Sequence, residues 1–298
     1  MVDLPLTPPR LTRRQLLFGA AAATAAGGLA LATDAVTLGA HHLVVERVEV
    51  RLPRLPERLD GFSIVQLSDF HYGGFNEPII RSAVSRTNEL APDVVVLTGD
   101  FVSHPYIGGK ARQAGRNAEP CAVLLSGLRA RLGAFAVLGN HDATTDPDFI
   151  SEALSGHGIH VLRNSSVALE RDGARLWLAG LDDVLERDHD PDRALSKIAR
   201  GETTLLLVHE PDYADEVARQ HFRTPVDFQM SGHSHGGQIR FPLVGPLYLP
   251  PLAEKYVEGL RQIGPMKLYT NRGVGTIGLP ARLNCPPEIT LFTLRRAV

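Results

Sequence analysis

Short apolar runs alternate with amphipathic stretches from about residue 44 onward. The runs are rich in Val, Leu and Ile and are bounded by turn-forming residues, which predicts buried strands. These strands are predicted at residues 62–68, 93–99, 134–139, 175–181, 203–209 and 226–232. Beyond residue 237 the helical pattern stops, and a last apolar run lies at 288–295. We therefore expect antiparallel strands to complete the sheet.

The stretches between the runs predict helices, and each has a proline near its first turn, where the missing N–H of proline is tolerated. These helices are predicted at residues 77–90, 119–131, 147–156, 191–200 and 211–220. Alternating strands and helices indicate an α/β domain. No internal repeat or long linker is visible, so one domain is expected over residues 62–298, after a lead-in and first strand region at residues 33–61.

The N-terminus departs from this pattern. Residues 16–33 are uncharged and rich in Ala and Gly, follow Arg13 and Arg14, and end in a small-residue site at Ala32. A basic start, a modest apolar stretch and such a site predict an export signal over residues 1–32, and the arginine pair resembles the twin-arginine type. The same residues could instead remain as a membrane anchor. A core helix is disfavoured because the segment has no polar face.

Charge and cysteine content narrow the function classes. The formal net charge is −2 overall and +2 in residues 1–32, which leaves −4 for the body. A mildly acidic body argues against nucleic-acid binding, which requires a basic surface. Cys121 and Cys285 cannot form a disulfide framework. They could pair in an oxidising compartment or remain as two buried thiols.

Side chains able to bind metal ions follow the predicted strands at their C-terminal ends. They are Asp69 and His71, Asp100, the run Asn140, His141 and Asp142, then His209, and finally His233 and His235. Because ligands of open α/β sheets gather at the carboxyl ends of strands, these loops should converge. Gly99, Gly139 and Gly232 precede them and would let the backbone turn sharply.

This donor set contains oxygen and nitrogen atoms and no thiolate. It suits Mn²⁺, Fe or Zn²⁺ and does not suit a structural zinc site, which favours cysteine. The set exceeds what one tetrahedral ion needs, whereas two ions that share a bridging carboxylate would use it fully. Each motif alone is weak evidence for a metal site, but the combination of all of them in this order indicates one.

The ordered motifs D-x-H, G-D, G-N-H-D, H and G-H-x-H resemble those of the calcineurin-like metallophosphoesterases, from about Phe62 to the C-terminus. The tail, with "GHSHGGQIRFPLVGPLYLP" and "RGVGTIGLPARLNCPPEI", is most similar to an exported bacterial branch. That branch includes phosphodiesterase-like enzymes and relatives that cleave UDP-diacylglucosamine. The resemblance implies a four-layer α/β/β/α sandwich with a dimetal site at the sheet edge, and a metallophosphoesterase domain over residues 62–298.

The resemblance also implies a role for each residue of the motifs. The first ion would be held by Asp69, His71 and His235, the second by Asn140, His209 and His233, with Asp100 bridging both. Mn²⁺ is favoured over Fe or Zn²⁺. His141 would be the catalytic histidine, supplying charge stabilisation and a proton for the leaving oxygen, and Asp142 would orient it.

The implied activity is dimetal-dependent hydrolysis of a phosphodiester or pyrophosphate, through attack of a metal-bridging hydroxide. One alternative is a membrane-associated hydrolase of a lipid-linked pyrophosphate such as UDP-2,3-diacylglucosamine, of the lipid A pathway type. That nucleotide-lipid is made on the cytoplasmic side, where an exported enzyme would not meet it. Another alternative is a metal-binding scaffold without turnover.

Expected partners are a phosphate-ester substrate, the twin-arginine export machinery and a membrane surface, and no nucleic-acid scaffold role is expected. The expected location is the periplasm or cell envelope, with membrane anchoring if the signal is not cleaved.

Two further features lie after the last metal motif. Arg272 is the preferred substrate contact and Arg240 the second, because a guanidinium binds phosphate through two N–H groups. Each could equally be a solvated surface charge. Residues 241–252, here called the lip segment, could form an apolar edge that meets acyl chains, or a rigid loop packed on the sheet. Residues 104–118 are expected to form a mobile loop beside Asp100.

Overall fold

The computed structural model describes residues 12–103, 115–186, 188–219, 222 and 224–297. Two six-stranded mixed sheets form the centre of the domain. The first sheet has the order β1 (Val44–Leu52), β14 (Glu288–Arg296), β2 (Ser63–Leu67), β3 (Val94–Leu97), β4 (Ala134–Ala136) and β5 (Ile159–Val161). The second has the order β12 (Gly259–Ile263), β13 (Met266–Thr270), β9 (Phe228–Ser231), β8 (Thr204–Leu207), β7 (Ala174–Gly180) and β6 (Ser165–Arg171).

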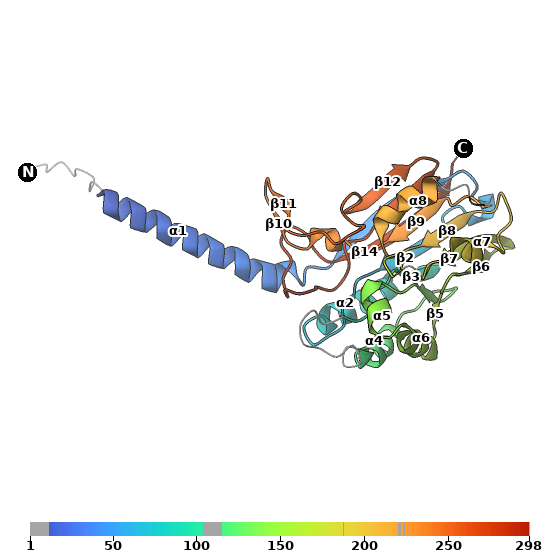
Figure 1. The fold of residues 1–298 in the computed structure, drawn as a ribbon, viewed down its shortest axis with the longest axis horizontal. Helices are drawn as coiled ribbons and strands as arrows, with labels where there is room; N and C mark the ends of the chain where they lie inside the picture. Colours follow the sequence, from blue (N-terminus) through green and yellow to red (C-terminus); the bar gives the residue numbers. More distant parts are fainter. Residues whose placement is uncertain (1–11, 104–114, 187, 220–221, 223, 298) are drawn as a thin grey trace, which may run out of the picture.

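Helices cover the outer face of each sheet (Figure 1). On the first sheet lie α2 (Glu77–Leu90), α4 (Ala118–Leu125) and α6 (Pro147–Gly156), with the short α5 (Asn140–Thr145) before α6. On the second lie α7 (Pro191–Leu195) and α8 (Ala214–Arg219). The 3₁₀ turns are η2 (Glu57–Leu59), η3 (Pro211–Tyr213) and η4 (His235–Gly237), and a two-stranded hairpin joins β10 (Arg240–Phe241) to β11 (Gly245–Pro246).

Strand β3 shows why the central strands are almost wholly apolar. Val95 and Leu97 pack into the core beneath the helices of the first sheet, whereas Val94 and Val96 pack into the core between the two sheets. Alternate side chains of a strand point to opposite faces, so a strand buried on both faces must be apolar throughout.

A third core lies between the second sheet and its helices, for example where Leu206 meets Ala194 and Val217. The cores therefore separate four layers, and the predicted α/β/β/α sandwich is confirmed.

Aromatic side chains join the two sheets. The ring of Phe292 on β14 lies 5.2 Å from that of Phe228 on β9 and 5.0 Å from that of Tyr269 on β13, both at nearly right angles. Edge-to-face contacts of this kind stabilise beyond the area they bury. They fix the sheets against each other beneath the rim that carries the metal motifs.

The predicted elements differ from the observed ones mainly at their ends. Helices 77–90 and 147–156 are found as predicted, whereas the predicted 119–131 helix ends at Leu125 and the 191–200 helix at Leu195. After Gly237 the described chain contains strands and turns and no helix, as predicted. The last strand is antiparallel to β2 but parallel to β1, so the ending is mixed.

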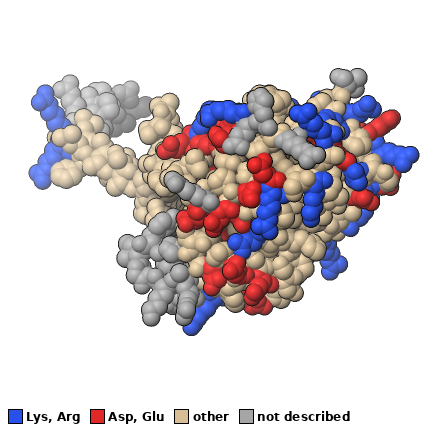
Figure 2. All heavy atoms as spheres, turned by 45° about the vertical axis from the view of Figure 1, so that its right-hand side comes forward, with Lys and Arg blue, Asp and Glu red and all other residues tan. Residues whose placement is uncertain are grey.

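The N-terminal residues form a helix that projects from the domain. Helix α1 (Arg13–Asp34) continues into a π-helical turn, η1 (Ala35–Gly39), and none of its own residues is buried (Figure 1). It is the one helix of the described residues that is long and apolar enough to cross a membrane, a test that signal sequences also pass. Figure 2 shows it as a rod that is uncharged over most of its length, with Lys or Arg near its outer end, while both charge signs are spread over the domain face in view.

Two further predictions concern the cysteines and the loop at residues 104–118. Cys121 and Cys285 are both buried and unpaired, which agrees with two buried thiols. The expected mobile loop at 104–118 lies mostly outside the described residues, which resume at residue 115.

Candidate metal centre

The loops that follow five strands meet at one rim, as the strand-end positions predicted. Asp69 and His71 follow β2, Asp100 follows β3, Asn140 and His141 begin α5 after β4, His209 follows β8, and His233 and His235 follow β9. The loops are joined by backbone bonds: the amides of Phe70 and His71 donate to the carbonyl of Asp100 at 2.8 and 2.9 Å. The backbone N–H of His233, from the second sheet, donates to Oδ1 of Asp69 at 3.0 Å, so the rim is a hydrogen-bonded unit built from both sheets.

The backbone is strained at this rim. Five of the residues have a positive φ although none is glycine: Asp69 (54°), His71 (42°), Asp100 (58°), His233 (68°) and His235 (50°). Such conformations are unfavourable for residues with a side chain, and they concentrate where function requires a side chain to be aimed. The strain here aims carboxylates and imidazoles at a shared space.

The three predicted glycines are all needed for close approach. A Cβ atom on Gly232 would lie 2.5 Å from Oδ2 of Asp69, and one on Gly139 would collide with Oδ1 of Asp100. Any larger residue would push these carboxylates away. Gly99 is the one that turns the chain, since its φ of +98° is a left-handed value.

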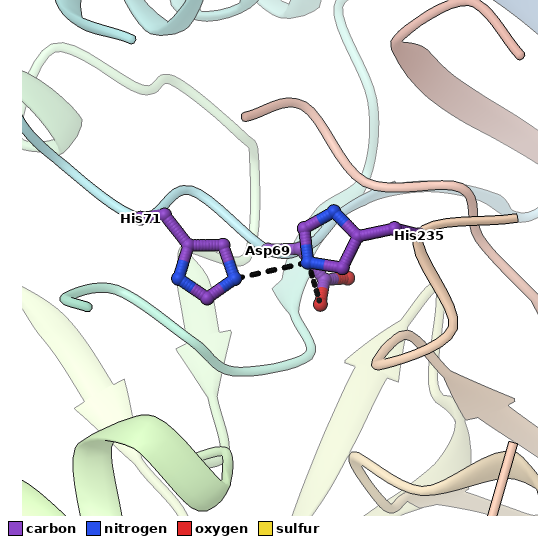
Figure 3. Close-up of side chains that lie close together, drawn as sticks. All are labelled: Asp69, His71 and His235. Carbon is purple, nitrogen blue, oxygen red and sulfur yellow. Dashed lines mark hydrogen bonds and ion pairs between the residues drawn. The ribbon is translucent and has the colours of Figure 1, made fainter. Parts of the chain in front are cut away.

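The first group of donors consists of Asp69, His71 and His235 (Figure 3). The Nε2 atoms of the two imidazoles face each other at 2.9 Å, and Nε2 of His235 lies 3.4 Å from Oδ1 of Asp69. Their ligand atoms all lie within 4.8 Å of one another. Two imidazole nitrogens aimed at one point beside a carboxylate fit a shared cation.

The second group consists of Asp100, His209 and His233, whose ligand atoms also lie within 4.8 Å of one another. Nδ1 of His209 contacts the carbonyl of Thr98 at 2.6 Å, so this nitrogen is the donor and Nε2 is the ring nitrogen that faces Asp100. Nε2 of His209 and Oδ1 of Asn140 are buried without a hydrogen-bond partner. Because buried polar atoms are normally satisfied, these two atoms fit a missing ligand.

Asp100 lies between the two groups. Its Oδ2 atom is 3.4 Å from Nε2 of His71 and 3.3 Å from Nε2 of His209, while Oδ1 accepts the backbone N–H of His141 at 3.0 Å. One oxygen therefore faces both groups and the other is used to hold α5. This geometry fits a carboxylate shared by two ions.

Burial favours neutral imidazoles in most of this site. It lowers the pKa of His71 to about 3 and that of His233 to about 3, and it lowers the pKa of His235 as well. A metal ligand must be deprotonated, so these histidines are ready to bind. His209 differs: burial lowers its pKa, but the charge and hydrogen bond of Asp100, together with the charges of Asp69 and Glu210, raise the pKa well above its usual value.

The Asp142 carboxylate is bound by backbone N–H groups. Its carboxylate accepts the N–H groups of Gly139 (3.0 Å), Phe101 (2.9 Å) and Val102 (3.1 Å). These bonds tie the loop after Asp100 to the first turn of α5. Asp142 thus fixes the turn that carries His141, and its predicted role of orienting His141 stays a prediction.

A cavity of about 510 Å³ opens over the donors. Asp100, Asn140, His141, His233 and His235 form its floor. Its walls are largely apolar and come from Leu185, Ile239, Leu247, Tyr248, Ile277 and Leu279. The strand and motif patterns gave no signal for Leu185, Ile277 and Leu279, because each comes from a loop without periodicity.

The predicted substrate arginines do not line this cavity. Arg272 is held by Glu46 at 2.7 Å and by Glu288 at 2.9 Å. Arg240 is held by Glu258 at 2.6 Å. Protein carboxylates thus occupy both guanidinium groups, and the predicted phosphate contacts have no support in the structure.

Arg282 is fully buried and supports the site from behind. Its guanidinium donates to the carbonyls of Arg272 (2.8 Å) and Gly275 (2.6 Å). Gly275 in turn donates to the carbonyl of Asp69 at 2.8 Å. This arginine therefore holds the loop that packs against Asp69 and is not available to a substrate.

Comparison with known proteins gives consistent matches. The family model for calcineurin-like phosphoesterases matches residues 62–237. The chain is 35% identical to the uncharacterized metallophosphoesterase YkuE of Bacillus subtilis (strain 168), over 96% of this chain and 98% of that protein. It is 34% identical to the phosphodiesterase YaeI of Escherichia coli (strain K12), over 84% of this chain and 88% of that protein. A transmembrane protein with metallophosphoesterase domain from Danio rerio is 34% identical over 84% of this chain and 57% of that protein.

Proposed function

The chain belongs to the calcineurin-like phosphoesterase family, and from this premise we propose that it is a dimetal phosphodiesterase. The observation that carries the proposal is the placement of Asp100, whose Oδ2 faces imidazoles of both donor groups. Similarity to a phosphodiesterase supports the choice of a diester over a monoester. A pyrophosphate remains within the same reaction class.

The donors fit two divalent ions. Asp69, His71 and His235 would hold the first, Asn140, His209 and His233 the second, and Asp100 would be shared. When bound, such ions supply Lewis-acid polarisation of the phosphoryl group and an activated water. The donor set is compatible with Mn²⁺, Fe or Zn²⁺, and we favour Mn²⁺.

The residues of this chain have separate tasks in that proposal. His141 lies on the cavity floor beside the donors and would give a proton to the leaving alcohol oxygen. The apolar walls would exclude bulk water from the phosphorus centre and so strengthen the electrostatic interactions there. Asp142 would keep His141 in place by holding the first turn of α5.

Metal dependence tests the proposal directly. The full-length protein in detergent is expected to hydrolyse bis-p-nitrophenyl phosphate with added Mn²⁺, to lose this activity with a chelator, and to regain it when metal is restored. Release of p-nitrophenolate measures all three. If none of Mn²⁺, Zn²⁺, Fe²⁺ and Ni²⁺ supports turnover of mono-, di- or pyrophosphoesters, the enzyme proposal fails. The alternative of a metal-binding scaffold without catalytic activity would then be favoured.

A lipid-linked phosphate or pyrophosphate is the second candidate substrate. The apolar cavity walls favour it over a highly polar soluble diester, because such walls bind apolar parts of a ligand. UDP-2,3-diacylglucosamine fits less well if the domain is exported, since it is made on the cytoplasmic side.

We further propose that residues 1–32 direct export by the twin-arginine route and that the domain acts in the periplasm or cell envelope. The apolar helix α1, which begins with Arg13 and Arg14, supports this. Replacing both arginines by lysine is expected to retain the precursor in the cytoplasm, as measured by cell fractionation, whereas Arg10→Lys should not. Continued export of the double variant would point to the general secretory route.

A further inference from the structure

We propose that the lip segment, residues 241–252, contacts the lipid bilayer and opens the metal-site cavity toward phosphodiesters carried by membrane lipids. This inference rests on the proposed phosphodiesterase function and names the class of its substrate. The segment is exposed, is supported by the same residues as the end of α1, and forms part of the cavity wall.

The lip segment presents large apolar side chains to solvent. Leu243 is fully exposed, and Val244, Tyr248 and Leu247 are 76%, 70% and 62% exposed. No residue of the segment is charged. Contiguous exposed apolar surface of this kind marks a contact with a partner or a membrane, because leaving it in water is unfavourable. The rigid-loop alternative is therefore disfavoured for the tip, which has almost no cover.

The lip segment and the end of α1 rest on the same support, residues 281–284. Ala35 packs with Ala281 and Leu283, and its carbonyl accepts the backbone N–H of Arg282 at 2.9 Å. The N–H of Arg240, directly before the lip segment, donates to the carbonyl of Leu283 at 3.0 Å. The exit of α1 and the lip segment are thus held at one end of the domain (Figure 1).

The length of α1 places the bilayer at that end. A helix of 22 residues is about 33 Å long at 1.5 Å per residue, which matches a hydrocarbon core of about 30 Å. Arg13 and Arg14 at its far end suit the cytoplasmic side. With α1 across the membrane, its exit at Ala35 lies at the surface, and the lip segment meets the same surface. This placement requires that α1 stays uncleaved as a membrane anchor.

The cavity wall continues the apolar surface inward. Leu247 and Tyr248 belong both to the exposed lip segment and to the lining of the cavity, and Leu279, 61% exposed, lies on the cavity wall. Among the described residues no Lys or Arg lines the cavity. This apolar surface, which runs from the lip segment into the cavity, suits a phosphodiester in which one of the two esterified alcohols carries acyl chains. The chains would lie along the wall and the phosphate would lie over Asp100 and His141.

The reaction on such a lipid is ordinary hydrolysis. The oxygen of water forms a bond to phosphorus, and the bond from phosphorus to one alcohol oxygen breaks. The alcohol leaves with a proton, and a phosphate monoester remains. No oxidant or further reactant is required.

Fluorescence tests the membrane contact separately from catalysis. Leu243→Cys in the full-length protein is labelled with an environment-sensitive dye and reconstituted in vesicles of phosphatidylethanolamine and phosphatidylglycerol. Cys121 and Cys285 are buried, which favours labelling at the new site. The matched control is Val123→Cys on α4, which is 53% exposed. Acyl-chain spin labels should quench the dye at 243 and not at 123. If aqueous iodide quenches the dye at position 243 and the acyl-chain spin labels do not, the proposal is overturned.

Kinetics tests the substrate class with a matched pair of probes. Bis-p-nitrophenyl phosphate is compared with a diacylglycerol p-nitrophenyl phosphodiester in the same vesicles. The wild type is expected to prefer the lipid probe in kcat/KM, and Leu243→Asp with Val244→Asp should raise KM for the lipid roughly tenfold or more while sparing the soluble diester. Val123→Asp should change neither.

The outcomes separate this inference from the proposed function. If the wild type cleaves neither probe, the phosphodiesterase proposal fails. If it cleaves the soluble diester but not the lipid, or if the double variant loses both activities equally, the lip segment is structural and the inference fails.

Discussion

Replacing Asp100 by asparagine is expected to abolish most phosphodiesterase activity and to leave the protein with fewer than two bound metal ions. The Oδ2 atom of Asp100 faces both His71 and His209, so the substitution removes negative charge from both donor groups at once. Loss of an outer-shell partner typically lowers affinity or activity 10–100-fold. A shared direct ligand should therefore lower activity by at least about 100-fold, as measured by kcat/KM and elemental analysis.

The substitution is suited to this test because it should not disturb the fold. Asparagine has the same shape and tolerates the left-handed backbone found at this position. Its amide oxygen can still accept the N–H of His141. An unchanged melting temperature of the metal-free form would confirm that the fold is intact.

Asn140→Ala is the matched control. Oδ1 of Asn140 is buried without a partner, so alanine leaves no donor unsatisfied, and only the second ion should be lost. Two ions per chain in Asp100→Asn would contradict the shared-ligand assignment.

The sequence could predict the rim because its signals are local. Each donor loop follows a buried strand, and Gly99, Gly139 and Gly232 mark a sharp turn or a close approach before three of these loops. The end of a parallel strand has a fixed place in an α/β sheet, so loops far apart in the sequence could be placed together. The same reasoning located β2, β3 and β4 to within a few residues.

The surroundings of the rim could not be predicted because they depend on contacts between residues that are far apart in the sequence. Arg272 looked free for phosphate, but its partners Glu46 and Glu288 come from β1 and β14, and Glu46 is 226 residues away. The cavity walls likewise combine Leu185 with Ile277, which no periodic pattern in the sequence connects. Local sequence shows a charge or an apolar residue, whereas its partner is set by the tertiary fold.

His141→Ala is expected to lower kcat by ~10²–10⁴-fold, the usual range for loss of a general acid, on a diester with an alkyl leaving group. His141 lies on the cavity floor, and its ring packs edge-on against that of His71 with centroids 4.9 Å apart. It is therefore beside the donors and open to a substrate. His160→Ala, an exposed histidine on β5, serves as the control and should have no effect.

The leaving group distinguishes proton donation from other roles of His141. p-Nitrophenolate leaves as an anion without a proton, so the loss on bis-p-nitrophenyl phosphate should be much smaller than on a dialkyl phosphodiester. Equal losses on both substrates would instead indicate that His141 stabilises charge or positions the substrate. His141 also lies within 4.8 Å of ligand atoms of His71 and Asp100, so metal content must be measured in the same variant. Two retained ions with a leaving-group-dependent loss would identify His141 as the general acid, whereas loss of an ion would make it a ligand.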